Sequence, residues 1–318
     1  MSAALALPLT ALTLLGTALG PCAGAPTRPP SPARSIQVQA GADAAASAAS
    51  PILDVGARLA ALVAAIPREK SYGTVWAAGL QQELATAAPF LLDVREPDEV
   101  ARDGSIPGSV NLPLRGLIAN LDRLPAPDRP IVTYCDSSHR GALAMVALRL
   151  LGYTDVRNLA FGLEAWWKAG LPVARDAPRA APVIGPASVV EGQTLLTVLK
   201  DLFDRLPADF HATTAGALHA DLAAGKNLFL FDVRRAAQYQ QEGHIQGAVS
   251  LPFEAFFASL DRLPSREAQM VIYCASGHRS SVVVAGLRLL GYRRVTGLGG
   301  GLTTWIAAGL PLVTAGPE

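Results

Sequence analysis

The sequence has few of the residues on which several common classes of protein depend. Its 318 residues include three cysteines, too few for a disulfide framework, and none stands in a CxxC or Cys/His spacing typical of zinc sites. Aromatic residues make up 6%, and 27 Lys and Arg balance 26 Asp and Glu. This composition argues against a nucleic-acid-binding surface. Only one uncharged apolar stretch approaches the length of a membrane span, which excludes a polytopic membrane protein.

Apolar residues, in contrast, are plentiful. They make up 50% of the chain, whereas charged residues make up 17%, and the mean hydropathy is +0.29. The chain can therefore build buried cores, which excludes a wholly disordered protein. At roughly 150 residues per domain, its length predicts about two domains.

The one apolar stretch lies at the N-terminus. Residues 1–27 carry no charged side chain, and small residues follow the apolar segment, as they do near an export cleavage site. We therefore expect a leader over residues 1–25 and export to the periplasm, with retention as an uncleaved membrane anchor as the alternative. Residues 26–52 are rich in Ala, Pro, Ser and Gly and are expected to form a flexible linker.

The rest of the chain contains one sequence twice. A shift that places Cys135 on Cys274 also superimposes long identical stretches without a gap. The matched stretches are 93–95 with 232–234, 121–125 with 260–264, 148–153 with 287–292, and 169–172 with 308–311. Such a match indicates two copies of one fold. We expect a first domain at residues 53–175, a linker at 176–192 and a second domain at 193–315.

Within each copy, short apolar runs of strand length alternate with helical segments. In the first copy, strands are expected at 90–94, 131–134 and 156–159, and helices at 141–151 and 163–169. A further helix ending in proline precedes each copy, at 53–67 and 195–207. This alternation predicts an α/β fold in which a mainly parallel central sheet is flanked by helices. Ligands bind beyond the carboxyl ends of the strands in such sheets, where both cysteines are expected.

Each copy has the same short loop between a strand and a helix. The loops are Cys135-Asp136-Ser137-Ser138-His139-Arg140 and Cys274-Ala275-Ser276-Gly277-His278-Arg279. A cysteine at this place faces the free N–H groups and the positive end of the helix, with Arg and His nearby, and all of these favour the thiolate. Consecutive loop amides can also form a nest for an anion. The alternative for each cysteine is a buried structural thiol.

These motifs resemble those of the rhodanese (sulfurtransferase) superfamily. The resemblance rests on residues 92–97, 242–248, 273–280 and Gly162, Leu163 and Trp166, and it covers nearly all of residues 55–313. It implies two tandem rhodanese-like domains in which the thiolate takes a sulfane sulfur from a donor such as thiosulfate. The cysteine persulfide then passes the sulfur to cyanide, a thiol or an acceptor protein, with no metal or organic cofactor.

The resemblance and the loop chemistry together assign roles to individual residues. Cys274 and Cys135 are the expected nucleophiles. The expected substrate-binding residues are Arg279, His278, Ser276, Gly277, Arg140, His139, Ser137, Arg234 and Arg95. For Arg95 and Arg234 the alternative is an ion pair with a neighbouring carboxylate, and for the two histidines it is a solvated loop position. Asp93 and Asp232 are expected to anchor the backbone through hydrogen bonds.

The two loops are not equivalent. Gly277 adopts a positive φ freely, whereas Ser138 at the same place costs roughly 1 kcal/mol. Asp136 adds a negative charge beside Cys135, which opposes both the thiolate and an anionic donor. His244 of the second copy is replaced by Ser105 in the first. We therefore expect Cys274 to be the stronger nucleophile and Cys135 to be slower.

Two other functions remain open at this point. One is a sulfur carrier or binding module that forms the persulfide but delivers it only to a protein partner. The other is a Cys-dependent phosphatase or arsenate reductase, whose loop has five residues between Cys and Arg. Four intervene in both loops of this sequence, and the smaller nest favours a single sulfur over a tetrahedral phosphate.

Overall fold

The computed structural model describes residues 51–176, 179–183 and 193–314. The expected leader, with Cys22, nearly all of the first expected linker and most of the second lie outside these residues. Within the described ranges, no helix has the length and apolar character needed to cross a membrane.

The first repeat follows the predicted alternation of strands and helices. Its elements are α1 (Pro51–Ala65), η1 (Ile66–Arg68), η2 (Lys70–Gly73), β1 (Thr74–Val75), α2 (Ala77–Thr86), β2 (Phe90–Asp93), α3 (Pro97–Asp103), β3 (Val110–Asn111), η3 (Leu114–Gly116), η4 (Ile118–Arg123), β4 (Ile131–Tyr134), α4 (His139–Leu150), β5 (Val156–Leu159) and α5 (Gly162–Lys168). The helix predicted at 141–151 begins earlier, at His139, inside the loop that carries the cysteine.

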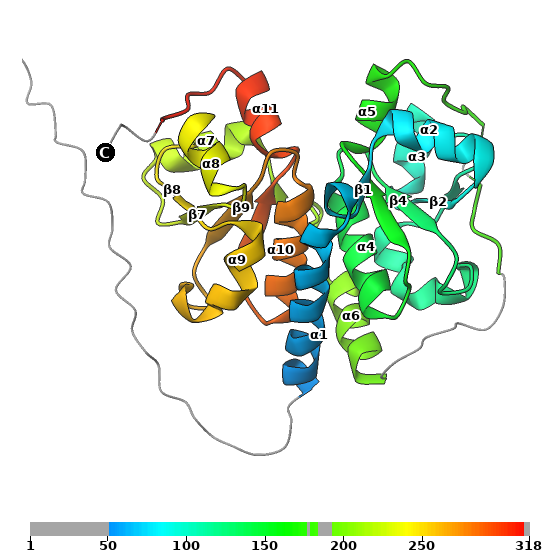
Figure 1. The fold of residues 1–318 in the computed structure, drawn as a ribbon, viewed down its shortest axis with the longest axis horizontal. Helices are drawn as coiled ribbons and strands as arrows, with labels where there is room; N and C mark the ends of the chain where they lie inside the picture. The colour runs from blue at the N-terminus through cyan, green and yellow to red at the C-terminus, as the bar shows by residue number, and fades with distance from the viewer. Residues whose placement is uncertain (1–50, 177–178, 184–192, 315–318) are drawn as a thin grey trace, which may run out of the picture. The chain divides into compact units, whose positions relative to one another are not determined.

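The second repeat has nearly the same order. Its elements are α6 (Gln193–Asp204), β6 (Ala212–Thr213), α7 (Ala215–Ala223), β7 (Phe229–Asp232), α8 (Ala236–Gln241), β8 (Ala248–Ser250), α9 (Phe253–Phe256), η5 (Phe257–Arg262), β9 (Met270–Tyr273), α10 (His278–Leu289), β10 (Val295–Leu298) and α11 (Gly301–Ala307). The cysteine loops, residues 135–140 and 274–279, are called the reactive loops below. Each lies where a central strand leads into a long helix, β4 into α4 or β9 into α10 (Figure 1).

Each repeat has one parallel sheet of five strands. The strand orders are β1-β5-β4-β2-β3 and β6-β10-β9-β7-β8, so corresponding strands occupy corresponding places. β4 pairs with β2 and β5, and β9 pairs with β7 and β10, all in parallel. The central strands β4 and β9 are buried at every position because helices cover both faces of the sheet. This confirms the predicted α/β fold with two tandem domains.

The helix that precedes each repeat packs mainly against the other repeat. α1 contacts α10 and η5 of the second repeat as well as α4, whereas α6 contacts η3 and η4 of the first repeat and also α10 (Figure 1). The approach of α1 to α10 is close: a Cβ added at Gly286 would lie 2.7 Å from Leu59 and 2.5 Å from Phe257. Each leading helix therefore packs against helices of the repeat that it does not precede in the sequence.

The exchange of leading helices joins the two repeats through one apolar core. This core contains residues of α1, α4, α6 and α10, and α4 packs directly on α10. A smaller cluster on the far face of each sheet belongs to one repeat, around Trp166 in the first and Trp305 in the second. The shared core fixes the two reactive loops, which begin α4 and α10, on a common scaffold.

Candidate active site

The two cysteines lie where the fold leads one to expect a ligand site. Each directly follows the central strand of its sheet, at the carboxyl end, and each precedes the first turn of a long helix. Cys135 is 0% exposed and Cys274 is 1% exposed. Neither forms a disulfide.

Both loops turn into their helix through a residue with left-handed backbone. The φ angle is 97° at Ser138 and 87° at Gly277, as the sequence predicts. Ser138 offsets part of its strain because its buried Oγ donates a hydrogen bond to Leu159 O at 2.9 Å and accepts one from Phe161 N at 2.9 Å. In the first loop, side-chain hydrogen bonds thus stabilise the left-handed conformation. In the second loop, glycine adopts this conformation without strain.

Two hydrogen-bond donors face the sulfur of Cys274. The N–H of Gly277 points to Sγ at 3.2 Å, and the hydroxyl of Ser280 lies 3.7 Å from it. The Ser280 hydroxyl also lies 3.0 Å from Gly277 O, so it can turn from the carbonyl to the sulfur when the sulfur becomes negative. Donors of this kind stabilise a thiolate.

Ser280 is not among the site residues expected from the sequence. Its counterpart is Gly141, where an added Cβ would lie 2.1 Å from Oδ1 of Asn158. The residue that corresponds to Asn158 is Gly297, which leaves that room in the second repeat. Gly141 and Asn158 of the first repeat thus correspond to Ser280 and Gly297 of the second. This paired difference is the signal in the sequence that could have revealed the Ser280 hydroxyl.

The environment of Cys135 opposes the thiolate. Burial and the neighbouring Asp136 carboxylate raise the pKa of the Cys135 thiol to about 11, although Arg140 and the amides of Gly141 and Ser137 act in the opposite direction. The helix amides and the arginine thus favour the thiolate as predicted, but burial and Asp136 outweigh them. The predicted effect of Asp136 is confirmed.

The arginine of the first loop is already bound by two carboxylates. Arg140 is buried; its Nη2 lies 2.7 Å from Oε1 of Glu99 and 3.0 Å from Oδ1 of Asp136. Although burial disfavours its charge, the hydrogen bonds of Glu99 raise the pKa of Arg140 above the usual value. A guanidinium neutralised in this way has little capacity left for an anionic donor.

The arginine of the second loop has different neighbours. Arg279 is half-buried, and its guanidinium lies 5.0 Å from the ring centroid of Tyr72. Among the described residues no carboxylate forms an ion pair with it, because Gln238 and Ala275 stand where the first repeat has Glu99 and Asp136. This charge remains available to an anion.

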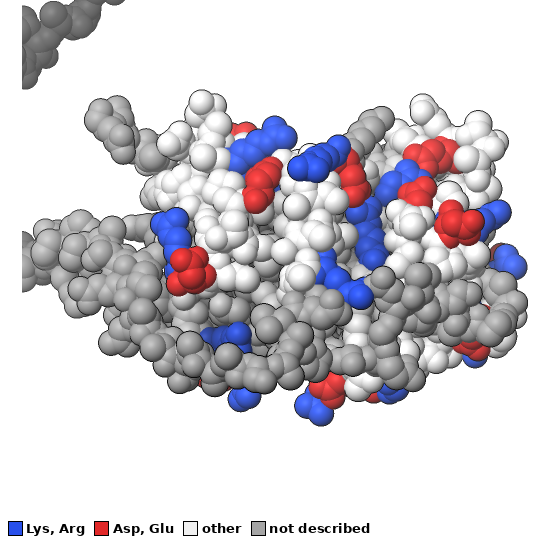
Figure 2. All heavy atoms as spheres, turned by 60° about the horizontal axis from the view of Figure 1, so that its bottom comes forward, with Lys and Arg blue, Asp and Glu red and all other residues white. Residues whose placement is uncertain are grey.

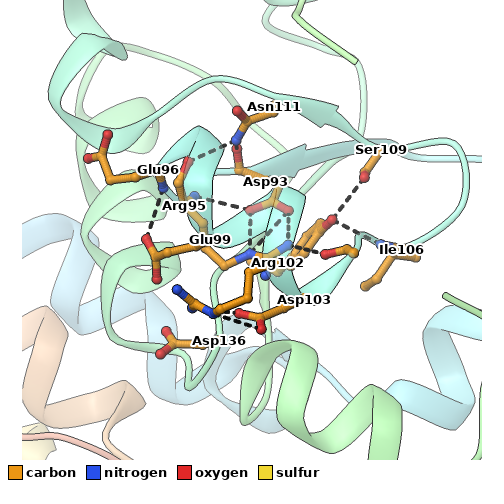
Figure 3. Close-up of polar contacts among 12 residues, drawn as sticks. Asp93, Arg95, Glu96, Glu99, Arg102, Asp103, Ile106, Ser109, Asn111 and Asp136 are labelled. Carbon is orange, nitrogen blue, oxygen red and sulfur yellow. Dashed lines mark hydrogen bonds and ion pairs between the residues drawn. The ribbon is translucent and has the colours of Figure 1, made fainter. Parts of the chain in front are cut away.

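Asp93 and Arg95 form a buried ion pair (Figure 3). Nε of Arg95 lies 3.0 Å from Oδ1 of Asp93, Nη2 lies 2.6 Å from Oδ2, and Nη2 also donates to Gly104 O at 2.7 Å. Asp232 and Arg234 repeat this arrangement, with Gly243 O as the third partner. The expectation that the two arginines bind the substrate is corrected in favour of its alternative. The pairs fix the loops after β2 and β7, as expected for Asp93 and Asp232.

The two loop histidines lie between the repeats. His139 contacts Ser281 Oγ at 2.6 Å and Phe210 O at 2.7 Å, and both partners belong to the second repeat. His278 contacts the first repeat through Asn158 Nδ2 at 3.1 Å and Tyr72 O at 2.9 Å. Both ring nitrogens of each histidine are therefore occupied. The expected donor-binding role is corrected, because both side chains are buried and hold the repeats together.

The two loop serines, Ser137 and Ser276, are half-buried between the cysteine and the helix. In the described ranges, His, Cys, Asp and Glu do not gather into a group of three that could hold a metal. On the face shown in Figure 2, positive and negative side chains are interspersed, which accords with the balanced composition.

The chain is similar to several known proteins. Residues 77–169 and 214–308 each match the rhodanese-like domain family. A protein named sulfurtransferase from Allochromatium vinosum is 39% identical over 95 residues, which are 30% of this chain and 87% of that protein. The human thiosulfate:glutathione sulfurtransferase is 34% identical over 100 residues, or 27% of this chain and 86% of the human protein. The crystal structure of thiosulfate sulfurtransferase from Pseudomonas aeruginosa is 27% identical, with a TM-score of 0.30, and the match covers 76% of this chain and 43% of that chain.

Proposed function

Since the chain belongs to the rhodanese-like domain family, we propose that it is a sulfurtransferase in which Cys274 carries the sulfur. The observation that carries this proposal is the pair of donors, Gly277 N–H and Ser280 Oγ, directed at the Cys274 sulfur. They supply hydrogen bonds where negative charge resides on the thiolate and then on the persulfide. The relatives named for sulfur transfer support the same reaction class.

The proposed reaction has two balanced steps. The Cys274 thiolate attacks the outer sulfur of thiosulfate, the S–S bond of the donor breaks, and sulfite leaves with the electron pair of that bond. The enzyme then holds a persulfide anion. In the second step the acceptor, cyanide or a thiolate, attacks the terminal sulfur, and the Cys274 thiolate is released. No metal or organic cofactor takes part in this scheme.

The proposed donor is a small anion. The guanidinium of Arg279 in the second loop forms no ion pair with a carboxylate among the described residues. The loop amides add partial positive charge at the start of α10. Thiosulfate is the simplest donor that combines a negative charge with a transferable sulfur. An acceptor protein in place of cyanide corresponds to the carrier function.

A direct assay tests the proposal. Purified whole chain is incubated with thiosulfate and cyanide, and thiocyanate is measured; we expect turnover above the uncatalysed rate. Absence of thiocyanate together with a loop peptide heavier by one sulfur would favour the carrier function. Turnover of an aryl phosphate instead would favour a phosphatase, which the four-residue spacing between Cys274 and Arg279 opposes.

We also propose that the chain is exported. The apolar, uncharged N-terminal segment supports this proposal. N-terminal sequencing of the protein made in its own cells tests it: removal of about 25 residues is the expected result, and an intact Met1 in a cytoplasmic fraction would contradict export.

A further inference from the structure

One short segment of each repeat crosses to the reactive loop of the other repeat. In the first repeat it follows α1 and contains Ser71 and Tyr72, with φ angles of 56° and 58°. In the second repeat it follows α6 and contains Phe210 and His211, with φ angles of 51° and 62°. Two consecutive non-glycine residues in left-handed conformation are unfavourable, typically by about 1 kcal/mol or more each. The same strain occurs in both crossing segments, so the surrounding structure holds the aromatic residue of each segment in place.

Tyr72 contacts the second repeat through its backbone oxygen, its hydroxyl and its ring. Its backbone oxygen lies 2.9 Å from Nε2 of His278, the first residue of α10. Its hydroxyl donates to Oε1 of Glu254 at 2.7 Å and accepts from Nε of Arg235 at 3.1 Å. Its ring lies 5.0 Å from the guanidinium of Arg279 and 5.7 Å from that of Arg235. One side chain of the first repeat thus organises two arginines of the second.

We infer that Tyr72 is a positioning residue of the Cys274 site, donated by the first repeat, and that it sets the specificity of this site for anionic sulfur donors. The inference rests on the proposed function for the identity of the donor. Tyr72 acts through Arg279: the face of its ring holds the guanidinium beside the loop without neutralising it, as a carboxylate would. The ring keeps the arginine in place and leaves its N–H groups free for the donor.

The first loop provides the contrast within the same molecule. There Phe210 takes the place of Tyr72, and its ring lies 4.9 Å from the guanidinium of Arg140 and 4.7 Å from that of Arg115. Arg140, however, is bound by Glu99 and Asp136. At the first loop the aromatic ring contacts an arginine that also forms ion pairs. At the second loop the ring contacts an arginine that forms no ion pair with a described carboxylate. Tyr72 therefore matters for anion binding at the second loop, whereas the Phe210 ring contacts an arginine that carboxylates already bind.

The first test measures local charge without any sulfur transfer. In the Cys135→Ser chain, Cys274 is alkylated with anionic iodoacetate or neutral iodoacetamide, and the loop peptide is quantified by mass spectrometry. We expect Tyr72→Ala to lower the iodoacetate-to-iodoacetamide rate ratio by about threefold, the effect of losing one cation–π contact. Tyr72→Phe keeps the ring and is expected to lie between Tyr72→Ala and the parent chain.

Phe210→Ala is the matched control, because it truncates the equivalent aromatic at the other loop. It is expected to leave the rate ratio at Cys274 unchanged. An unchanged ratio in Tyr72→Ala, or an equal fall in Phe210→Ala, would overturn the inference, since the effect would then be absent or a general loosening between repeats. Should Tyr72→Ala fail to fold, Tyr72→Leu fills the space without a π face and makes the same comparison.

The second test uses the donor. In the same background, Tyr72→Ala is expected to raise the KM for thiosulfate about fivefold, as a lost cation–π contact and hydrogen bonds imply, and to leave the KM for cyanide unchanged. Equal changes in both KM values would contradict a role in donor binding. If no variant and not even the parent chain releases thiocyanate, the proposed function fails, whereas the alkylation ratio still decides whether Tyr72 positions Arg279.

Discussion

The two reactive loops have the same backbone conformation but differ in the sign of the charge on the residues around them. Four acidic residues of the first repeat, namely Glu96, Asp98, Glu99 and Asp136, correspond to Arg235, Ala237, Gln238 and Ala275 in the second. Both loops have a left-handed residue at the helix start and a cysteine at the end of the central strand. The fold therefore provides the loop amides in both repeats, while a few side chains determine whether the loop stabilises a thiolate and binds an anion.

The largest difference in activity between the two loops is expected when each cysteine is replaced in turn. We expect Cys274→Ser to lower the rate of thiocyanate formation at least about a hundredfold, because a serine hydroxyl is a far weaker nucleophile than a thiolate. Cys135→Ser is expected to retain most of the activity. Nearly full activity in Cys274→Ser would reverse our ranking of the loops.

The pH dependence of alkylation tests the raised pKa of Cys135. With a pKa of about 11, the Cys135 thiol stays protonated at neutral pH. Its rate with iodoacetamide should therefore rise about tenfold per pH unit from pH 7 to 10, because the thiolate fraction does so below the pKa. Peptide mapping at each pH gives the rate. A plateau for Cys135 below pH 9 would contradict a raised pKa.

Exchanging the charge beside the cysteine should make one loop resemble the other. Asp136→Ala gives the first loop the residue of the second, and we expect alkylation of Cys135 at pH 8 to quicken about fivefold, the effect of losing a nearby like charge. Arg140 keeps its contact with Glu99 in this variant. Ala275→Asp is the reciprocal change and should slow Cys274 by a similar factor. No change in either variant would mean that Asp136 does not set the difference.

The smallest effect is expected at the hydroxyl that faces Cys274. Ser280→Ala removes the weaker of the two donors and should lower kcat about threefold, the worth of one modest hydrogen bond. Ser281→Ala, one residue further along α10, is a control because its hydroxyl contacts Gly277 O and His139 rather than the sulfur. A larger loss in Ser281→Ala than in Ser280→Ala would contradict the assignment.

The sequence sufficed for those features that depend on local pattern. Apolar runs and their repetition predicted β2, β4 and β5, and the loop motif predicted both cysteine positions and the disadvantage caused by Asp136. Such features depend on neighbours in the chain, which periodicity and composition report.

Features that depend on distant partners could not be predicted. The amphipathic pattern of α1 and α6 shows that each helix buries one face, but not which repeat that face packs against. His139 and His278 find their partners on the other repeat, at Phe210 O and Tyr72 O, so their buried position has no signature in the loops. The pairing of Arg95 with Asp93 was one of two open alternatives, and the burial of both residues decides it.

We propose that Cys274 accepts a sulfur atom more readily than Cys135 does. The most direct measurement is mass spectrometry of both loop peptides after brief exposure of the whole chain to limiting thiosulfate. We expect one added sulfur on the Cys274 peptide, with the Cys135 peptide largely unchanged. Sulfur on Cys135 alone, or on neither peptide, would contradict it.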